Sequence, residues 1–146
     1  MLAARKLSSA DNESAPRIRL CMAVNNLNVG GLERLVISLV NHLPRERYEL
    51  SLVCLSGEGK LFSQVDLPRS ACLVLDKDPD LGRATERARV PVLMYRIARF
   101  LGEQRVDILD VHNLAPLVFA GGAARLMPFG PRVIYCLLYT SPSPRD

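Results

Sequence analysis

The chain has 146 residues, enough for one domain with a hydrophobic core and too few for two. Its net charge of +4 comes mostly from dispersed arginines, and with 5% aromatic residues it lacks the stacking platforms typical of nucleic-acid binding. No signal-peptide core and no apolar stretch of about 18 residues, the length that spans a membrane, is present. We therefore expect a soluble cytoplasmic protein, peripheral to the inner membrane face at most, that does not bind nucleic acid.

The cysteines give no sign of a metal site or of a disulfide framework. Cys21, Cys54, Cys72 and Cys136 show no C-x-x-C spacing, and the first three lie inside apolar runs. Such cysteines are typical of small buried side chains in a reducing compartment. No cluster of carboxylates is spaced for a metal either, so we expect no metal.

Both ends of the sequence differ from what lies between them. Residues 1–16 are polar and rich in Ser and Ala, which predicts a disordered tail. Residues 136–146, CLLYTSPSPRD, agree at every position with the in-frame translation of a sequencing-library transposon adaptor. We interpret them as a non-native tail and expect the natural chain to continue past Tyr135. Residues 17–135 then carry the fold.

Between these ends, short apolar runs alternate with segments of helical spacing. The predicted strands are 17–24, 49–55, 71–75, 107–111 and a last one that begins at 133. The predicted helices are 32–43, 60–65, 91–102 and 116–126. Leu32, Leu35, Val36, Leu39, Val40 and Leu43 are expected on one face of the first helix, which Pro44 ends. Pro91 is expected at the first position of the third helix, after a polar stretch with Pro79 and Gly82.

The order of these elements predicts a fold class. The strands carry apolar residues at most positions, as strands covered on both faces do, and strands alternate with helices. We therefore expect a doubly wound parallel α/β sheet of the Rossmann-like kind. Ligands of such sheets bind beyond the carboxyl ends of the strands, beside the first strand. Three segments should meet there: 25–31, 54–59 and 111–116.

Gly30 and Gly31 lie where the first of these segments becomes a helix. Backbone without a Cβ can come close to a ligand, and free N–H groups at a helix start favour an anion. The pair could equally make only a tight turn. A dinucleotide fingerprint is absent, because no G-x-G-x-x-G is present and Ser56 lies near the place where an acidic ribose partner is expected. No Gly-Lys-Ser/Thr follows, so the loop is not a P-loop.

Three segments resemble glycosyltransferase family 4. They are NLNVGGLER at the start of the first helix, VDILDVHN on the fourth strand, and LAPLVFAGGAARL followed by PRVIY. The resemblance covers residues 18–135 and implies an incomplete N-terminal, acceptor-side domain of a GT-B-fold enzyme, without the later strands of that domain. It implies that Gly30 and Gly31 lie near the diphosphate of the donor. His112 matches the second histidine of the family's His-x-His pattern, and Asp110 replaces the first.

The resemblance also implies a function. The enzyme would be a retaining glycosyltransferase that moves a sugar from a nucleotide-sugar to a polysaccharide, lipid-linked or other glycan acceptor without a metal. His112 and Asn113 would contact the acceptor; alternatively, His112 is satisfied by backbone at a strand end. The family's donor-binding domain, with its E-x7-E motif, is expected to be absent, so the chain alone should be inactive. A non-catalytic α/β binding module and a nucleotide-cofactor oxidoreductase or epimerase stay open as alternatives.

Overall fold

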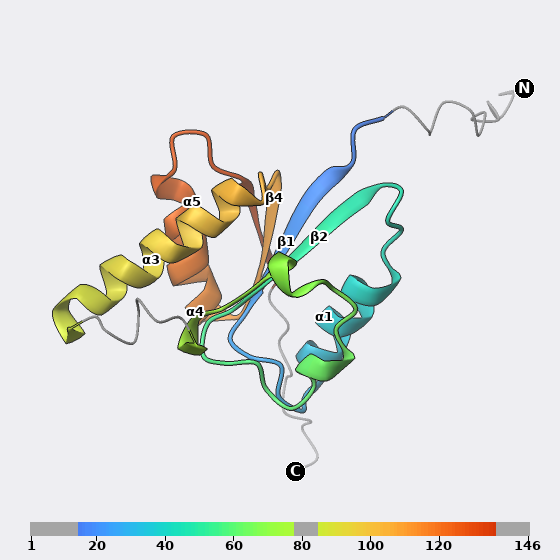
Figure 1. The fold of residues 1–146 in the computed structure, drawn as a ribbon, viewed down its shortest axis with the longest axis horizontal. Helices are drawn as coiled ribbons and strands as arrows, with labels where there is room; N and C mark the ends of the chain where they lie inside the picture. Colours follow the sequence, from blue (N-terminus) through green and yellow to red (C-terminus); the bar gives the residue numbers. More distant parts are fainter. Residues whose placement is uncertain (1–14, 78–84, 137–146) are drawn as a thin grey trace, which may run out of the picture.

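The computed structural model describes residues 15–77 and 85–136, and within these ranges five strands form one parallel sheet (Figure 1). The strands are β1 (Ile18–Val24), β2 (Tyr48–Cys54), β3 (Cys72–Val74), β4 (Ile108–His112) and β5 (Arg132–Cys136). Their order is β3-β2-β1-β4-β5, and all neighbours run parallel. The chain thus winds outward from β1 to β3 and then outward again from β4 to β5. This confirms the predicted doubly wound sheet, with its switch point between β1 and β4.

Helices cover both faces of the sheet. Helix α1 (Gly31–His42) packs on one face, and α3 (Glu86–Glu103) packs on the other together with a helical run over residues 114–126 (Figure 1). This run consists of α4 (Leu114–Pro116), the π-helical turn η5 (Leu117–Gly121) and α5 (Gly122–Leu126). The connections also contain three short 3-10 turns, η2 (Phe62–Gln64), η3 (Arg69–Ala71) and η4 (Leu75–Lys77).

Each face of the sheet has its own hydrophobic core. In β1, Met22 and Val24 pack with α1, whereas Cys21 and Ala23 pack with α3 and α5. Successive side chains of a strand point to opposite faces, so a strand covered on both sides is apolar at most positions. This is why the apolar runs in the sequence located the central strands to within about one residue.

The predicted buried face of α1 is wrong at one position. Leu35 is exposed, while Ile37, which the prediction left out, is buried together with Val36 and Val40. Two overlapping apolar stripes run along this helix, and only its docking on β1 and β2 selects between them. The helix ends at His42, before Leu43, whose extended backbone fits the restriction that Pro44 imposes on the preceding residue.

The predicted start of the third helix is also wrong. Helix α3 begins at Glu86, with Thr85 as its N-cap, so Pro91 lies inside the helix rather than at its first position. Proline has no N–H, and the helix therefore lacks the hydrogen bond that residue 91 would donate to the carbonyl of Arg87. Helical spacing on both sides of Pro91 and packing on the sheet outweigh this loss.

The remaining differences are small. A single 3-10 turn, η2, replaces the predicted helix over 60–65, and the last helical run begins two residues earlier than predicted, at Leu114. Strand β5 extends to Cys136, which pairs with His112. The stretch with Pro79 and Gly82 and most of the two predicted tails (1–16 and 136–146) lie outside the residues that the structure describes.

Candidate functional site

The first two predicted segments form one hydrogen-bonded unit at the carboxyl edge of the sheet. The backbone N–H of Leu27 donates to the carbonyl of Glu58 at 2.9 Å, and the N–H of Leu61 donates to the carbonyl of Leu27 at 2.8 Å. The N–H of Ser56 donates to the carbonyl of Asn25 at 2.8 Å. The loop after β1 is therefore held by the loop after β2, which fixes the entry into α1.

Gly59, which the sequence indicates as a turn residue after the second strand, also packs against the loop after β1, a contact that the sequence does not predict. Its φ is +80°, a left-handed conformation that favours glycine, and a Cβ there would collide with the backbone of Leu27 and Asn28. The signal in the sequence was the Gly-x-Gly spacing of Gly57 and Gly59, because Gly57 also has a positive φ of +124°. The glycine that the turn requires therefore follows β2 and not β1.

Gly30 and Gly31 have a different environment. Gly30 is the N-cap of α1 with extended backbone (φ −172°, ψ 170°), and neither glycine has a positive φ. A Cβ on Gly31 would have no heavy atom within 4 Å, whereas a Cβ on Gly30 would displace the carboxylate of Glu33. The N–H groups of the first turn have no partner inside the helix and point out at this edge. Gly31 thus leaves open space at the positive end of the α1 dipole, where an anion is favoured.

The third predicted segment begins at the end of β4. Leu109 and Val111 belong to the core beneath α3 and α5, so Asp110 and His112 point to the opposite face, the side of α1. Asp110 lies between Met22 of β1 and Ile134 of β5 in the sheet register. His112 is 1% exposed, and its Nε2 lies 3.2 Å from Oδ2 of Asp110. The i, i+2 spacing on a strand was the sequence signal for this pair.

This acid–imidazole pair is not fully satisfied. The 3.2 Å approach is not aligned as a hydrogen bond, and Nδ1 and Nε2 of His112 and Oδ1 of Asp110 have no hydrogen-bond partner among the described residues. A buried polar atom without a partner costs about 1–3 kcal/mol. The alternative that backbone satisfies His112 at the strand end therefore finds no support in the described part of the chain.

Asn113 follows His112 in a strained conformation. Its φ of +75° and ψ of 169° lie in a region that is almost restricted to glycine, at a cost of about 1–3 kcal/mol. The side chain is exposed, and the carbonyl accepts a hydrogen bond from the N–H of Leu117 at 3.3 Å. The helical run begins at Leu114 with α4, and its second element, η5, is a π-helical turn, a feature that is frequent at functional sites. The backbone thus reverses sharply beside the buried imidazole.

The predicted site residues consequently occupy one edge of the sheet. Gly30 and Gly31 follow β1, and His112 and Asn113 end and follow β4, the two strands that flank the switch point. Parallel neighbouring strands place their carboxyl ends side by side. The edge offers a helix start with open space at Gly31 and the carboxylate of Glu33 in its first turn, a buried acid–imidazole pair and an exposed amide.

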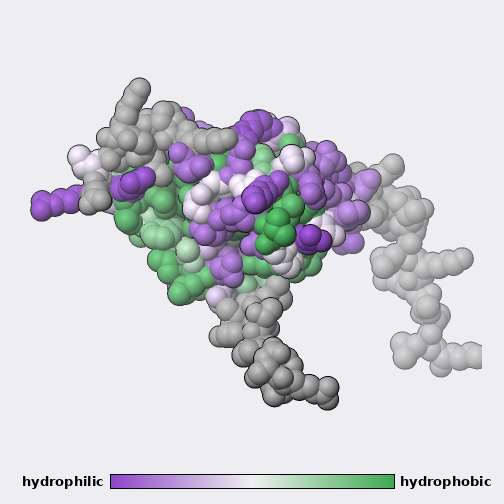
Figure 2. All heavy atoms as spheres, turned by 90° about the horizontal axis from the view of Figure 1, so that it is seen from below, coloured by the Kyte–Doolittle hydropathy of each residue, from purple (hydrophilic) through white to green (hydrophobic). Residues whose placement is uncertain are grey.

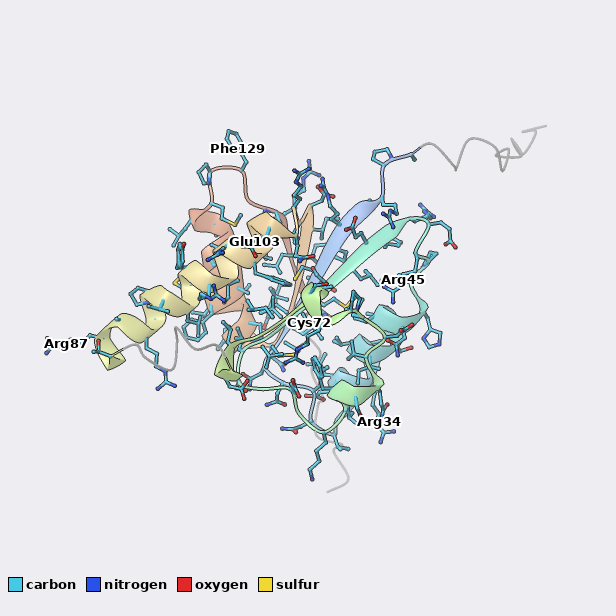
Figure 3. All side chains as sticks on the ribbon, viewed as in Figure 1. Arg34, Arg45, Cys72, Arg87, Glu103 and Phe129 are labelled. Carbon is cyan, nitrogen blue, oxygen red and sulfur yellow. The ribbon has the colours of Figure 1, made fainter. Side chains whose placement is uncertain are left out.

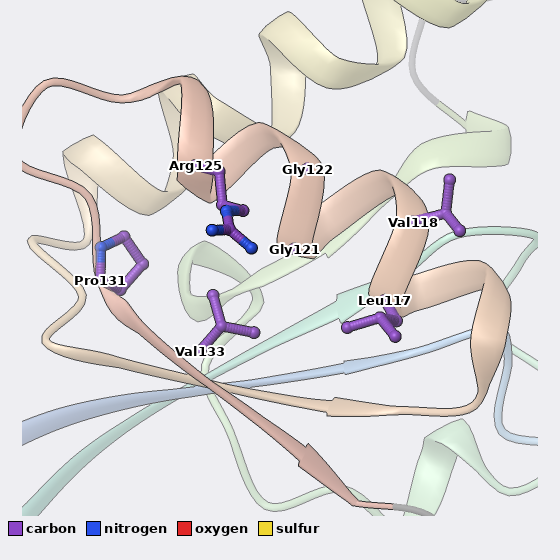
Figure 4. Close-up of a pocket in the computed structure, with 7 residues that line it drawn as sticks. All are labelled: Leu117, Val118, Gly121, Gly122, Arg125, Pro131 and Val133. Atoms are coloured by element: carbon purple, nitrogen blue, oxygen red, sulfur yellow. The ribbon is translucent and has the colours of Figure 1, made fainter.

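A separate groove opens between the helical run and β5 (Figure 4). It has a volume of about 560 Å³ and is lined by Leu117, Val118, Gly121, Gly122, Arg125, Pro131 and Val133. Arg125 points into it (Figure 4). Its lining has one charged side chain and no carboxylate or imidazole, so it lacks a pair of groups for acid–base chemistry. We therefore place the candidate site at the switch point and not in this groove.

Ionisable groups away from this edge have structural roles. Burial raises the pKa of the Cys21 and Cys54 thiols to about 12, which keeps both thiols protonated. At the opposite edge, Asp107 accepts hydrogen bonds from the backbone N–H of Arg19 at 2.9 Å and from its guanidinium at 3.2 Å. These hydrogen bonds lower the pKa of Asp107. All four cysteines are free.

Residues 15–77 and 85–136 contain neither a metal-binding cluster nor a membrane-spanning helix. Within these ranges, no group of three His, Cys, Asp or Glu side chains is placed to hold a metal ion. No helix there is both long enough and apolar enough to cross a membrane.

Comparison with known proteins gives one match. A family model described as Glycosyltransferase Family 4 matches residues 29–137. These residues include Gly30, Gly31, His112 and Asn113, and they extend through β5. No curated protein and no solved structure matches the chain.

Proposed function

Because the chain belongs to glycosyltransferase family 4, a family of GT-B-fold enzymes, we propose that residues 17–135 form the acceptor-side domain of an enzyme that transfers a sugar from a nucleotide-sugar donor to a glycan acceptor. One observation carries the proposal: Gly31 leaves the N-terminus of α1 open at the switch point, beside the end of β4. A departing nucleoside diphosphate is an anion that this helix start would stabilise. The donor-binding wall of the cleft belongs to a second domain.

The two halves of the edge take different roles in this proposal. Gly30 and Gly31 bring backbone N–H groups towards the diphosphate of the donor. His112 ends β4, the strand next to β1, and Asn113 follows it; these two residues form the acceptor side. Transfer proceeds without a metal, because fixed N–H groups and the α1 dipole balance the charge that develops on the leaving group. Retention of configuration is what the resemblance to the family implies. The acceptor is a polysaccharide intermediate, a lipid-linked sugar or another glycan.

The test is product formation by the parent enzyme, supplied with a panel of nucleotide-sugars and monitored for nucleoside diphosphate release that depends on acceptor. We expect release that persists in EDTA, and a product anomer of the same configuration as the donor sugar by NMR. Release that depends on a divalent metal would refute the metal-free mechanism, and an inverted product would refute retention. A bound dinucleotide in the purified enzyme would instead favour the oxidoreductase or epimerase alternative.

The outer part of α3 suggests how a lipid-linked acceptor is reached. Arg87 lies at the tip of this helix, and Arg89 follows it one half-turn later (Figure 3). Exposed Val90 and Tyr95 lie on the same helix and Leu126 on α5, and together they line an apolar pocket of about 440 Å³. Seen from the edge where the strands end, hydrophobic side chains gather on the side of these helices (Figure 2). Cationic and apolar side chains together suit the surface of an anionic membrane.

This membrane contact is tested by co-sedimentation with vesicles. We expect binding to vesicles of phosphatidylcholine mixed with phosphatidylglycerol, and no binding to phosphatidylcholine alone. Arg87→Glu and Arg89→Glu should each weaken binding, and the two together should abolish it. The single reversal Arg47→Glu, beyond the other end of the sheet, is the matched control for each and should leave most of the binding. Equal binding by all variants would show that α3 is only a solvated outer face.

A further inference from the structure

Asp110 is a carboxylate on the face of a sheet between apolar neighbours. Its side chain is mostly buried, and the ion pair that the structure gives it is with His112, whose partner in the sheet register is Cys136. On the α1 face, the register places Met22 on one side of Asp110 and Ile134 on the other. Burial of a carboxylate in such surroundings is unfavourable unless the carboxylate is paired with a charged group or hydrogen-bonded.

The arrangement of Asp110 and His112 has a free-energy cost. Three buried polar atoms lack hydrogen-bond partners among the described residues, and the adjacent Asn113 is strained. A pair that served stability alone would be replaced by apolar residues of similar volume at little or no loss. Strain and unsatisfied groups persist where the surrounding fold imposes them, and they gather at functional sites.

We propose that Asp110 is a positioning residue for His112. When the imidazole turns so that the 3.2 Å contact is aligned as a hydrogen bond, the carboxylate holds the proton on Nε2. The lone pair of Nδ1 is then left to accept a hydrogen bond from a hydroxyl group of the acceptor. Nδ1 is closed to solvent in this structure, so the acceptor reaches it only when the neighbouring turn at Asn113 moves. The assignment of the hydroxyl to an acceptor sugar rests on the proposed glycosyltransferase function.

The tautomer of His112 can be determined directly by NMR. The chain has only two histidines, so the imidazole ¹⁵N signals of His112 and His42 are easily assigned. We expect His112 of the full chain to carry its proton on Nε2. Asp110→Asn should give a mixture of tautomers, because an amide presents either its oxygen or its nitrogen to the ring. The exposed His42 is the internal control.

Asp107→Asn is the matched control variant. It removes the same charge one residue before β4, at the opposite edge of the sheet, where the carboxylate pairs with Arg19. It should leave the signal of His112 unchanged. If His112 of the wild-type chain carries its proton on Nδ1, the proposal is wrong, and this result requires no variant to fold. An unchanged His112 signal in folded Asp110→Asn would also overturn it.

The functional part of the inference is tested in the parent enzyme by product release. Asp110→Asn should lower kcat by about tenfold or more, with a smaller change in KM for the acceptor, because a misplaced group affects the reacting geometry more than binding. In the background of His112→Gln, Asp110→Asn should have no further effect. Additive losses would show that Asp110 does not act through His112. A wild-type enzyme that releases no nucleoside diphosphate would refute the proposed function and leave the tautomer result standing.

Discussion

Two alanine substitutions separate an anion-binding role from a turn-forming role at the carboxyl edge. At Gly31, the first residue of α1, the backbone is not left-handed and a Cβ would meet no atom within 4 Å. Alanine there strains nothing and favours the helix by up to about 1 kcal/mol. At Gly59, with φ +80°, alanine is strained by about 1–2 kcal/mol and also meets the backbone of Leu27.

The expected outcomes are therefore opposite. Gly31→Ala should keep or slightly raise the melting temperature. It should lower kcat/KM of the parent enzyme tenfold or more, because its methyl group fills the space through which the diphosphate reaches the backbone N–H groups. A tenfold loss corresponds to about 1.4 kcal/mol of transition-state stabilisation. Gly59→Ala should lose about 2 kcal/mol of stability or more, which is a fall of roughly 5–10 °C in the melting temperature. The folded fraction of that variant should retain its specific activity.

The assays are a thermal melt and steady-state release of nucleoside diphosphate, both corrected for the folded fraction. Gly30→Ala is a third, intermediate variant, since its methyl group only displaces the flexible carboxylate of Glu33. If Gly31→Ala folds normally and transfers sugar at the wild-type rate, no diphosphate approaches this backbone and the anion-site assignment fails. A stable Gly59→Ala variant would refute the conformational argument at that turn.

Three other predictions follow from the packing. Unfolded thiols lose their protons near pH 9, but folded Cys21 and Cys54 keep theirs to about pH 12. The free energy of unfolding is therefore unaffected by these thiols below pH 9 and falls between pH 9 and 12 by about 1.4 kcal/mol per thiol per pH unit. Urea unfolding at pH 10 should show this loss of stability, and Cys54→Ala should reduce it. Asp107→Ala should lower stability by about 1 kcal/mol, because it removes the partner of the Arg19 side chain and backbone N–H; no loss in urea would mean that the exposed ion pair is fully screened. Pro91→Ala should raise the melting temperature, since it restores a hydrogen bond inside α3, whereas a proline at the first helical position would give no gain.

Part of the candidate site could be predicted because sequence order and sheet geometry suffice for it. Once β1 and β4 are parallel neighbours, the segments that follow them must share an edge, and this places Gly31 and His112. Neither the burial of His112 nor the conformation of Asn113 follows from local sequence. Both depend on which strands and helices pack around the end of β4.

The sequence by itself determined the position of the strands, the parallel class of the sheet and the family, because apolar runs, helical spacing and short motifs are local properties of the chain. Only the tertiary structure decided that Ile37 rather than Leu35 is buried, that α3 runs through Pro91, and that Gly59 is the glycine the turn requires. It also decided that Asp110 lies against His112 and that the side chain of His112 is almost fully buried. These outcomes depend on contacts between residues far apart in the chain, whose energies outweigh the local preferences that a sequence pattern records.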